Sequence, residues 1–525
     1  MRKFFERLDR LADINRDGGA VAWLERIAFV FLLLTFASAP HSIAATQTAW
    51  IIGMLAWIIR LPLRPRIRFR FGPLDAALWA FFIWSVVSSL TSYEPLVSID
   101  RLRGTAVFLI FYFVFYNVRT MRAASLAAVV MIASCMISVL WMPVERLLGR
   151  GVEIHGVAAN SPLAKPGLID GDTLLEVNKK KVTTPDEVVK GLETAEIAKV
   201  RFYRPDFELT IDVKRSDLLA GTGALEQLGI TGWKKSHNWR SKGFYGHYTT
   251  YAEVLQLIGS LIFGLLIAGL AGLGFGNSSG GPDAAKPSRV VIGLLFLALL
   301  GTGLALLLTV TRGPQLGLAV SGGLIVLAGL GRKWFIAAVL IMLPVAIGGL
   351  IFLQQSRNVE FLDSKDESTK YREMMMRDGV RLWTQSPRHF ILGVGMDSIQ
   401  KHWEEWGLFD RGWQPMGHFH STYLQLLVER GSPALLLWLG IIAIYARKLW
   451  KGLRSRESLD WPSIGLLLGA FGGLAGFATS GLVHYNLGDQ EVAMVLFILM
   501  GLACKIVTLR PEAGQAVTET EPGRR

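Results

Sequence analysis

Apolar runs of about 20 residues recur along most of the chain, and they limit its possible folds more than any other feature. A helix rises about 1.5 Å per residue, so such a run crosses the roughly 30 Å hydrocarbon core of a membrane. Of the 525 residues, 51% are hydrophobic and only 18% are charged, a balance that suits a lipid solvent better than one large soluble core. We therefore predict an all-α polytopic membrane protein with one small inserted α/β domain.

The runs divide into about twelve predicted membrane spans. They cover residues 25–44, 47–62, 73–90, 104–118, 123–142, 249–271, 289–310, 314–331, 334–353, 421–445, 461–482 and 491–508. The net charge of +13 does not indicate a nucleic-acid partner, because the basic residues gather in short links between runs. Lys3 and Arg7 precede the first run, and Arg64 and Arg66 follow the second. Since such residues stay on the cytoplasmic side, both termini are predicted to be cytoplasmic.

Composition divides the chain into six predicted parts. They are N-terminal spans (1–145), a periplasmic α/β domain (146–216), a transmembrane core preceded by a basic periplasmic segment (217–353), a periplasmic loop with an amphipathic helix (354–420), C-terminal spans (421–510) and a disordered cytoplasmic tail (511–525). The two cysteines, Cys135 and Cys504, lie inside apolar runs, so we expect neither a disulfide framework nor a thiol metal site.

The predicted domain at 146–216 is similar to a PDZ domain. Short alternating strands surround Gly/Pro/Asp turns and one helical stretch, DEVVKGLETA. The resemblance rests on SPLAKPGLIDGDTLLEVNKKKV, with Gly167, Gly171, Asp172 and Asn178 at the turns. A PDZ domain ordinarily binds an extended peptide as an added strand. A peptide or protein ligand and a spacer without a ligand both stay open for this domain.

Three polar clusters fall at the predicted outer ends of the spans. The first is Arg312 in LLLTVTRGPQLGLAV, in an outer link where a cation opposes the positive-inside rule. Gly313 is expected to permit a tight reversal, and Pro314 to begin the next helix. The arginine either snorkels to lipid headgroups or binds an anion, since its guanidinium offers a fixed fork of donors to phosphate oxygens.

The second cluster is the basic, aromatic segment KKSHNWRSKGFYGHYTTYAEVLQL, which leads into the span 249–271. Arg240, Lys242 and His247 lie close together there, and they suit either acidic headgroups or a lipid diphosphate.

The third cluster is MGHFHSTYLQLL. His420 directly precedes Ser421, a predicted N-cap, and the positive end of a helix favours the neutral imidazole. A neutral imidazole can accept a proton, although a histidine at a membrane interface also suits a simple amphipathic role.

Five separated motifs together resemble the O-antigen ligase and polymerase superfamily. They are RSKGFYGHYTTYAEVL (240–255), TRGPQLG (311–317), SPRHFILGVGMDSI (386–399), HFHSTYLQLLVERG (418–431) and GLVHYNLGDQEVAMVLFILMGL (481–502). The resemblance implies an inverting glycosyltransferase that moves an undecaprenyl-diphosphate-linked glycan to an acceptor hydroxyl, without a metal ion or cofactor. It also implies a multi-pass protein of the bacterial inner membrane, with its active site facing the periplasm.

The resemblance assigns roles to particular side chains. Arg312 matches the diphosphate-binding arginine and is also expected to act in catalysis, Arg240 matches the second arginine, and His420 matches the essential histidine. Lys242 is expected to help bind the diphosphate. The secondary candidates are His418, His247, Arg372 and His484.

The acceptor is left open by the sequence. Lipid A-core, a growing glycan and a protein all fit, corresponding to a ligase, a polymerase and a protein O-glycosylating enzyme. Two other classes stay open: a transporter of polysaccharide or lipid, and a non-catalytic membrane scaffold that recruits partners through the PDZ-like domain.

Overall fold

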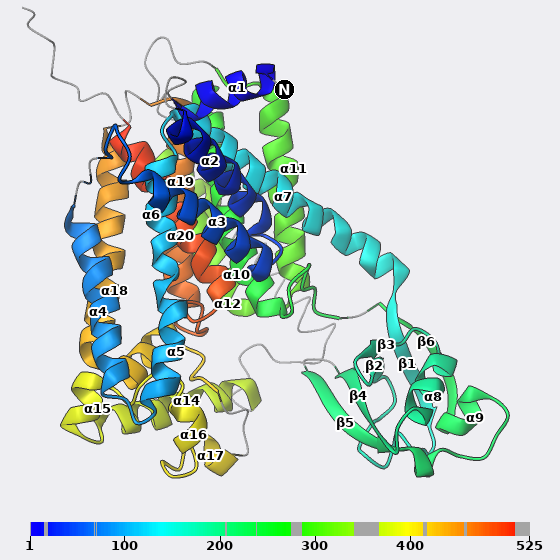
Figure 1. Cartoon of the computed structure of the whole chain (residues 1–525). Helices are drawn as coiled ribbons and strands as arrows, with labels where there is room; N and C mark the ends of the chain where they lie inside the picture. The colour runs from blue at the N-terminus through cyan, green and yellow to red at the C-terminus, as the bar shows by residue number, and fades with distance from the viewer. Residues whose placement is uncertain are drawn as a thin grey trace, which may run out of the picture. The chain divides into compact units, whose positions relative to one another are not determined.

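In the computed structural model, the chain folds into two compact units (Figure 1). The first comprises Met1–Met136, Phe244–Leu307 and Thr311–Arg525, and the second comprises Ile137–Gly243 with Leu308–Val310. The structure describes residues 2–14, 19–67, 69, 71–204, 207–237, 239–274, 286–340, 367–412, 417–455 and 459–509. Most of the predicted span 334–353, the start of the predicted loop 354–420 and the predicted disordered tail lie outside these residues.

The first unit is a helical bundle. Its elements are α1 (Arg2–Ala12), α2 (Ala20–Ser38), α3 (Ile43–Arg60), α4 (Pro73–Leu90), α5 (Pro95–Thr105), η2 (Ala106–Phe108), α6 (Leu109–Asn117), α10 (Tyr248–Gly272), α11 (Arg289–Leu308), α12 (Arg312–Gly329), α14 (Glu367–Thr384), α15 (Pro387–Leu392), α16 (Ile399–His402), α17 (Phe409–Gly412), α18 (Thr422–Arg454), α19 (Trp461–Ser480) and α20 (Gln490–Thr508). Helix α7 (Met121–Leu148) begins in the first unit and ends in the second.

Nine helices of the described part are long and apolar enough to cross a membrane, namely α2, α3, α4, α7, α10, α11, α18, α19 and α20. The chain is therefore a multi-pass membrane protein. Of the other predicted spans, 104–118 lies in the stretch α5–η2–α6, 314–331 is α12, and 334–353 is only partly described. The predicted total of about twelve stays a prediction.

Glycines let the inner helices of the bundle approach closely. In the apolar window of α10, 89% of the residues are buried, against 17% in α11, so α10 is an inner helix and α11 an outer one. A Cβ added to Gly469 of α19 would lie 2.6 Å from the Cα of Leu261 in α10, which is too close for any larger residue. Dispersion contacts at such close crossings hold helices together in lipid, where burial from water contributes little.

A buried ion cluster joins helix ends at the end of the bundle that holds the N-terminus. Glu25, near the start of α2, accepts from Arg60 at the end of α3 (2.7 Å) and from Arg119 after α6 (2.8 Å). The predicted alternation of the spans requires these three segments to meet, because α2 starts where α3 and α6 end. Cytoplasmic placement of this end stays a prediction.

The second unit is a small α/β fold. Its elements are β1 (Arg150–Val157), β2 (Thr173–Val177), β3 (Lys180–Lys181), α8 (Pro185–Glu193), β4 (Ile197–Arg204), β5 (Phe207–Lys214), η3 (Arg215–Asp217), α9 (Ala224–Leu228) and β6 (Ile230–Ser236). The sheet order is β5-β4-β2-β1-β6, with β3 paired to β2. The unit extends past the predicted boundary at 216, because β6 pairs antiparallel with β1 and so places Ile154 opposite Trp233.

The turn residues behind the PDZ resemblance have structural roles in this unit. The carboxylate of Asp172 accepts from Arg204 at 2.6 and 2.8 Å and from the Ile169 amide at 2.9 Å. Asn178 has a left-handed φ of 50°, and its side-chain oxygen accepts from the Lys199 amide. Strand β1 lies between β2 and β6, and the two edge strands of the sheet are β5 and β6. A peptide could therefore add as a strand only beside β5 or β6. The PDZ similarity and a peptide ligand stay predictions.

Candidate active site

The site begins with the short segment that precedes α18. Ser421 is the N-cap of α18, as predicted, and its hydroxyl accepts from the Leu424 amide. Phe419 is buried, and its amide donates to Gln425 Oε1 at 2.8 Å. His418 and His420 flank Phe419, and their ring centroids lie 4.4 Å apart. The predicted pair of imidazoles is thus held at the N-terminus of one helix by an apolar anchor between them.

The backbone of His420 adopts a left-handed conformation with φ of 47°. Residues other than glycine rarely adopt this conformation, because it costs about 1–3 kcal/mol of free energy. Residues that do adopt it cluster at functional sites. The hydrogen bonds of the neighbouring Phe419 and Ser421 therefore hold the His420 backbone in a conformation that the local sequence disfavours.

The link between α19 and α20 closes over the start of α18. The Thr422 amide donates to the carbonyl oxygens of Gly481 (2.9 Å) and His484 (3.0 Å). The Thr422 hydroxyl bonds Asn486 Oδ1 at 2.8 Å, and Asn486 Nδ2 donates to the Phe477 carbonyl at 2.9 Å. The backbone of His484 therefore satisfies an amide that a helix N-terminus would otherwise leave unpaired.

Arg312 lies beside this link because of the residue that follows it. Arg312 is the first residue of α12 and is exposed. Gly313 packs against the ring of His484: an added Cβ would lie 2.5 Å from Cδ2 and 2.7 Å from Nε2. The predicted reversal at Gly313 is wrong, because the left-handed residue is Val310 (φ 53°) and the helix already includes Gly313. Pro314 is the third residue of α12 rather than the predicted first.

Replacing Gly313 with alanine is expected to displace the His484 ring and to lower the rate of the glycan transfer that the resemblance implies about 10- to 100-fold, because small misplacements at a reacting centre are costly. The measurement is the transfer rate of the purified variant. Gly303→Ala is the matched control, since a Cβ on this glycine of α11 meets nothing within 4 Å. Equal rates for both variants would show that the contact with His484 does not matter.

His418, His420 and His484 are neutral near pH 7. Burial lowers the pKa of His420 to about 4, with smaller effects from the charges of His418, Arg372 and His247. Burial also lowers the pKa of His484 to about 3, followed by the charge of Arg372 and those of the other histidines. The pKa of His418 is lowered mainly by burial. Helix α14, which carries Arg372, packs against the start of α18, because its Met375 and Leu382 share a buried cluster with Phe419 and Leu424.

His247 is the N-cap of α10, where its Nδ1 accepts from the Thr249 amide at 3.2 Å. The predicted residues of the first unit thus lie at one end of its bundle, at the starts of α10, α12 and α18, in α14 and in the α19–α20 link (Figure 1). Arg240 and Lys242 belong to the second unit. There, burial lowers the pKa of Lys242, whose Nζ lies 3.8 Å from Glu208 Oε1. A shared site with Arg312 stays a prediction for these two residues.

Buried acidic residues, which the sequence analysis did not single out, support the same end of the bundle. Glu253 of α10 accepts from Ser480 and, at 3.4 Å, from Asn486. Thr250 donates to Asp489 at 2.5 Å, and burial, followed by the neighbouring Glu491, raises the pKa of Asp489 to about 7. Two motifs of the resemblance contain these residues: RSKGFYGHYTTYAEVL includes Thr250 and Glu253, and GLVHYNLGDQE includes Asn486 and Asp489.

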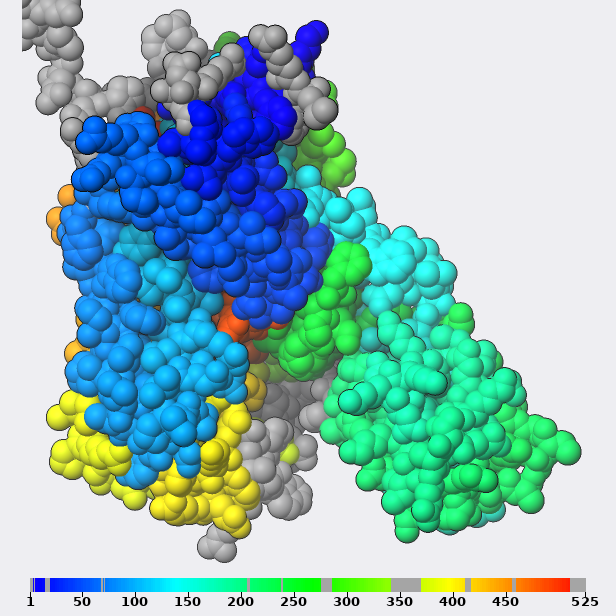
Figure 2. Space-filling model, in the orientation of Figure 1, coloured from blue at the N-terminus to red at the C-terminus, as the bar shows by residue number. Residues whose placement is uncertain are grey.

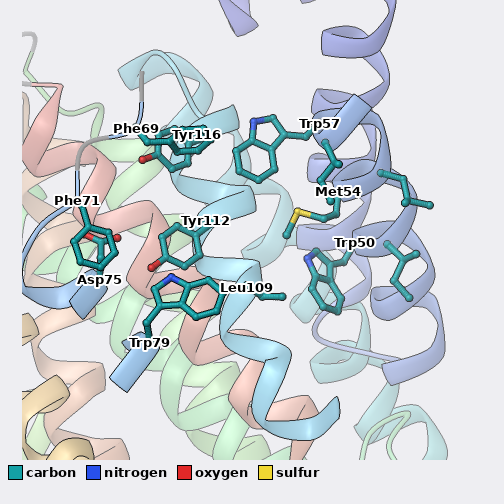
Figure 3. Close-up of a pocket in the computed structure, with 13 residues that line it drawn as sticks. Trp50, Met54, Trp57, Phe69, Phe71, Asp75, Trp79, Leu109, Tyr112 and Tyr116 are labelled. Atoms are coloured by element: carbon teal, nitrogen blue, oxygen red, sulfur yellow. The ribbon is translucent and has the colours of Figure 1, made fainter. Parts of the chain in front are cut away.

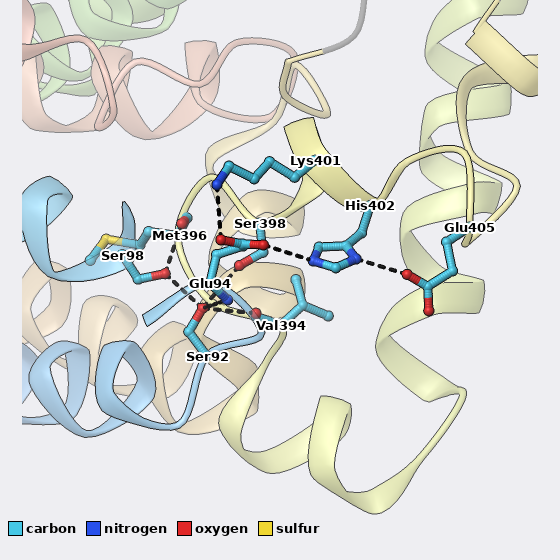
Figure 4. A network of polar contacts seen from close by, with 9 residues as sticks. All are labelled: Ser92, Glu94, Ser98, Val394, Met396, Ser398, Lys401, His402 and Glu405. Carbon is cyan, nitrogen blue, oxygen red and sulfur yellow. Dashed lines mark hydrogen bonds and ion pairs between the residues drawn. The ribbon is translucent and has the colours of Figure 1, made fainter. Parts of the chain in front are cut away.

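The segment that leads toward the histidines is tied to the α4–α5 turn (Figure 4). Glu94 accepts from Lys401 at 2.9 Å and lies 3.3 Å from His402 Nε2, and His402 Nδ1 lies 2.8 Å from Glu405. The hydroxyls of Ser92 and Ser398 lie 2.9 Å apart. In the space-filling view, α4–α5 and the segment 370–412 form a continuous surface (Figure 2). These contacts fix the loop without placing a further reactive group beside His420.

His389, in the same segment, has a structural role. Its Nδ1 lies 2.9 Å from the Leu382 carbonyl oxygen and its Nε2 lies 2.8 Å from the Tyr93 hydroxyl. Among the described residues, no group of three or more His, Cys, Asp or Glu side chains is arranged to hold a metal ion.

The fold and the site therefore define a polytopic membrane protein with imidazoles and a guanidinium at one end of its bundle. Residues 294–439 match the family described as O-Antigen ligase. This match confirms the predicted resemblance to the O-antigen ligase and polymerase superfamily. The family implies glycan transfer of the ligase or polymerase type, with a lipid-linked glycan donor and a polysaccharide or lipid acceptor. The matched region contains Arg312, Arg372 and His420. No curated protein matches the chain.

Proposed function

We propose that the chain transfers a glycan from an undecaprenyl diphosphate carrier to an acceptor hydroxyl on the periplasmic face of the bacterial inner membrane. The observation that carries the proposal is the neutral His420, held in a left-handed conformation beside the link that packs on Gly313, within the O-antigen ligase region. A neutral imidazole next to an exposed guanidinium suits a reaction that takes one proton and releases one anion.

In the proposed step, the acceptor oxygen attacks the anomeric carbon of the donor from the side opposite the diphosphate. The new carbon–oxygen bond forms as the bond to the diphosphate breaks, so the anomeric configuration inverts. His420 takes the hydroxyl proton, and the leaving diphosphate departs with the electron pair. Arg312, at the N-terminus of α12, stabilises the developing negative charge, because both the guanidinium and the helix dipole favour an anion there.

The remaining residues have supporting roles in the proposal. Burial keeps His420 neutral, and the positive charge of Arg372 acts in the same direction. The assignment of Arg240 and Lys242 to the diphosphate rests on the resemblance alone. The step requires no metal ion and no cofactor.

The test is transfer by the purified full-length chain in liposomes, with a synthetic undecaprenyl-diphosphate-linked glycan and separate acceptors. We expect release of undecaprenyl diphosphate in a 1:1 ratio to a new glycosidic bond of inverted configuration, unchanged by a metal chelator. Transfer to lipid A-core indicates a ligase, and transfer to a second donor glycan indicates a polymerase. Glycan flux across the bilayer without bond formation would instead establish a transporter, and absence of both activities a scaffold.

A further inference from the structure

A cavity of about 490 Å³ lies between α3, α4, α6 and the link before α4 (Figure 3). Aromatic rings form much of its wall: Trp57 stacks on Tyr116 with centroids 5.6 Å apart, and Phe69 lies 5.0 Å from Tyr116. Its volume falls within the roughly 300–1,000 Å³ typical of small-molecule sites. The cavity is therefore large enough for a ligand and is built by side chains that pack against one another.

The residues that line the cavity favour a hydrocarbon ligand. Of the described residues that line it, Asp75 alone carries a charge, and its carboxylate already accepts from the Gly72 amide at 2.8 Å as part of the α4 capping box. Three lining side chains of α3 are also about half exposed on the surface of this span, namely Ile51 (49%), Leu55 (53%) and Ile58 (48%). A cavity whose rim is the apolar surface of a membrane span opens to acyl chains rather than to water.

The indole N–H of Trp57 indicates which class of lipid the cavity binds. Trp57 is buried, with only 6% of the residue exposed, and its indole Nε1 has no hydrogen-bond partner among the described residues. Buried indole N–H groups usually find an acceptor. Trp57 lies three residues before the end of α3, about 4.5 Å along the axis, and the link that follows exposes Arg64 and Arg66. An acceptor at this depth, with a phosphate just beyond it, is the arrangement of a glycerophospholipid ester group.

We propose that this cavity binds one acyl chain of a glycerophospholipid, whose ester carbonyl accepts from Trp57 while Arg64 and Arg66 contact its phosphate. A polyprenyl chain has no ester carbonyl and would leave the indole unpaired. Trp50 Nε1 also has no partner among the described residues, but it lies seven residues deeper in α3, where an acyl chain offers no acceptor. The two tryptophans therefore serve as a matched pair.

The experiment is quantification of the lipid that co-purifies with the full chain in mild detergent, by native mass spectrometry and lipid extraction. We expect about one diacyl glycerophospholipid per wild-type chain. Leu109→Trp, which fills the cavity, is expected to lower this amount at least about fivefold, because the added ring occupies the ligand volume. Ile83→Trp makes a similar change on the exposed side of α4, where Ile83 is 59% exposed, and is expected to retain the wild-type amount.

The ester contact is tested with variants that keep the cavity open. Trp57→Phe is expected to lower retention of an added ester-linked lipid about threefold or more relative to its ether-linked analogue, because a hydrogen bond contributes an amount of this order, whereas Trp50→Phe leaves the ratio unchanged. Equal lipid content in Leu109→Trp and wild type overturns the proposal. So does preferential binding of a polyprenyl phosphate, or an ester-to-ether ratio that Trp57→Phe does not change.

Discussion

Replacing His420 with alanine is expected to lower the rate of glycan transfer by about 10²- to 10⁴-fold, the usual contribution of a positioned general base. The neutral imidazole is the proposed proton acceptor, and alanine leaves the acceptor hydroxyl without one. The measurement is the release of undecaprenyl diphosphate by the purified variant at saturating donor and acceptor. The loss should appear in kcat, because proton transfer belongs to the chemical step and not to binding.

The matched control is His155→Ala, which removes a histidine of the second unit and is expected to leave the rate unchanged. His418→Ala separates the two neighbouring imidazoles, whose centroids are 4.4 Å apart. Full activity of His420→Ala together with an inactive His418→Ala would transfer the role of base to His418. Full activity of both variants would end the proposed mechanism.

The pH profile distinguishes a catalytic role of His420 from a structural one. A base acts only when deprotonated, and burial lowers the pKa of His420 to about 4. The acid limb of kcat/KM should therefore lie near pH 4 instead of near the ordinary histidine pKa of about 6.5. Arg372→Gln removes a positive neighbour that lowers this pKa, so it should move the limb to higher pH. A limb near pH 6.5 in the wild type would contradict the assignment.

The sequence predicts helices well where an apolar run is bounded by polar links. The predicted spans 73–90 and 461–482 agree closely with α4 (Pro73–Leu90) and α19 (Trp461–Ser480). The prediction is less accurate where a helix carries polar residues on its exposed side. The stretch PLVSIDRLRGT forms α5, but its composition predicts no membrane span, and the predicted span therefore starts only at residue 104.

Long-range pairing explains the main difference in the second unit. Lys234, Lys235 and Ser236 open the basic segment that is predicted to lead into the membrane. In the structure these residues end β6, which pairs with β1 more than 70 residues earlier in the chain. Only the partner strand determines such a pairing, so the local pattern could not reveal it.

In the candidate site, too, the sequence predicts individual residues but not the contacts between distant segments. Motifs identified His420 and Arg312 individually, and the N-cap at Ser421 followed from the local sequence. The contact of Gly313 with His484 and the hydrogen bond of Thr422 to the His484 carbonyl join segments far apart in the chain. These contacts determine where the imidazoles lie, and they depend on helix packing that no single segment encodes.

Replacing Arg312 with alanine is expected to lower the transfer rate by about 10²- to 10³-fold, the usual effect of removing one donor from a site where negative charge develops. Arg312 is exposed at the first turn of α12, where its guanidinium can reach two oxygens of a diphosphate at once. Arg312→Lys keeps the charge but loses the planar fork of donors. It should therefore retain part of the activity, between the alanine variant and the wild type.

The readout for Arg312 is kcat and the donor KM, measured separately with the purified chain. If Arg312 binds the diphosphate equally well in the ground state and the transition state, its loss changes KM alone, whereas the loss of a cation that stabilises the leaving group only in the transition state lowers kcat. Arg289→Ala is the matched control, because Arg289 is an exposed arginine at the start of the neighbouring helix α11, at the opposite end of the bundle. If only the donor KM changes in Arg312→Ala, the role of Arg312 is limited to donor binding. If neither kcat nor KM changes, Arg312 only contacts lipid headgroups at the start of α12.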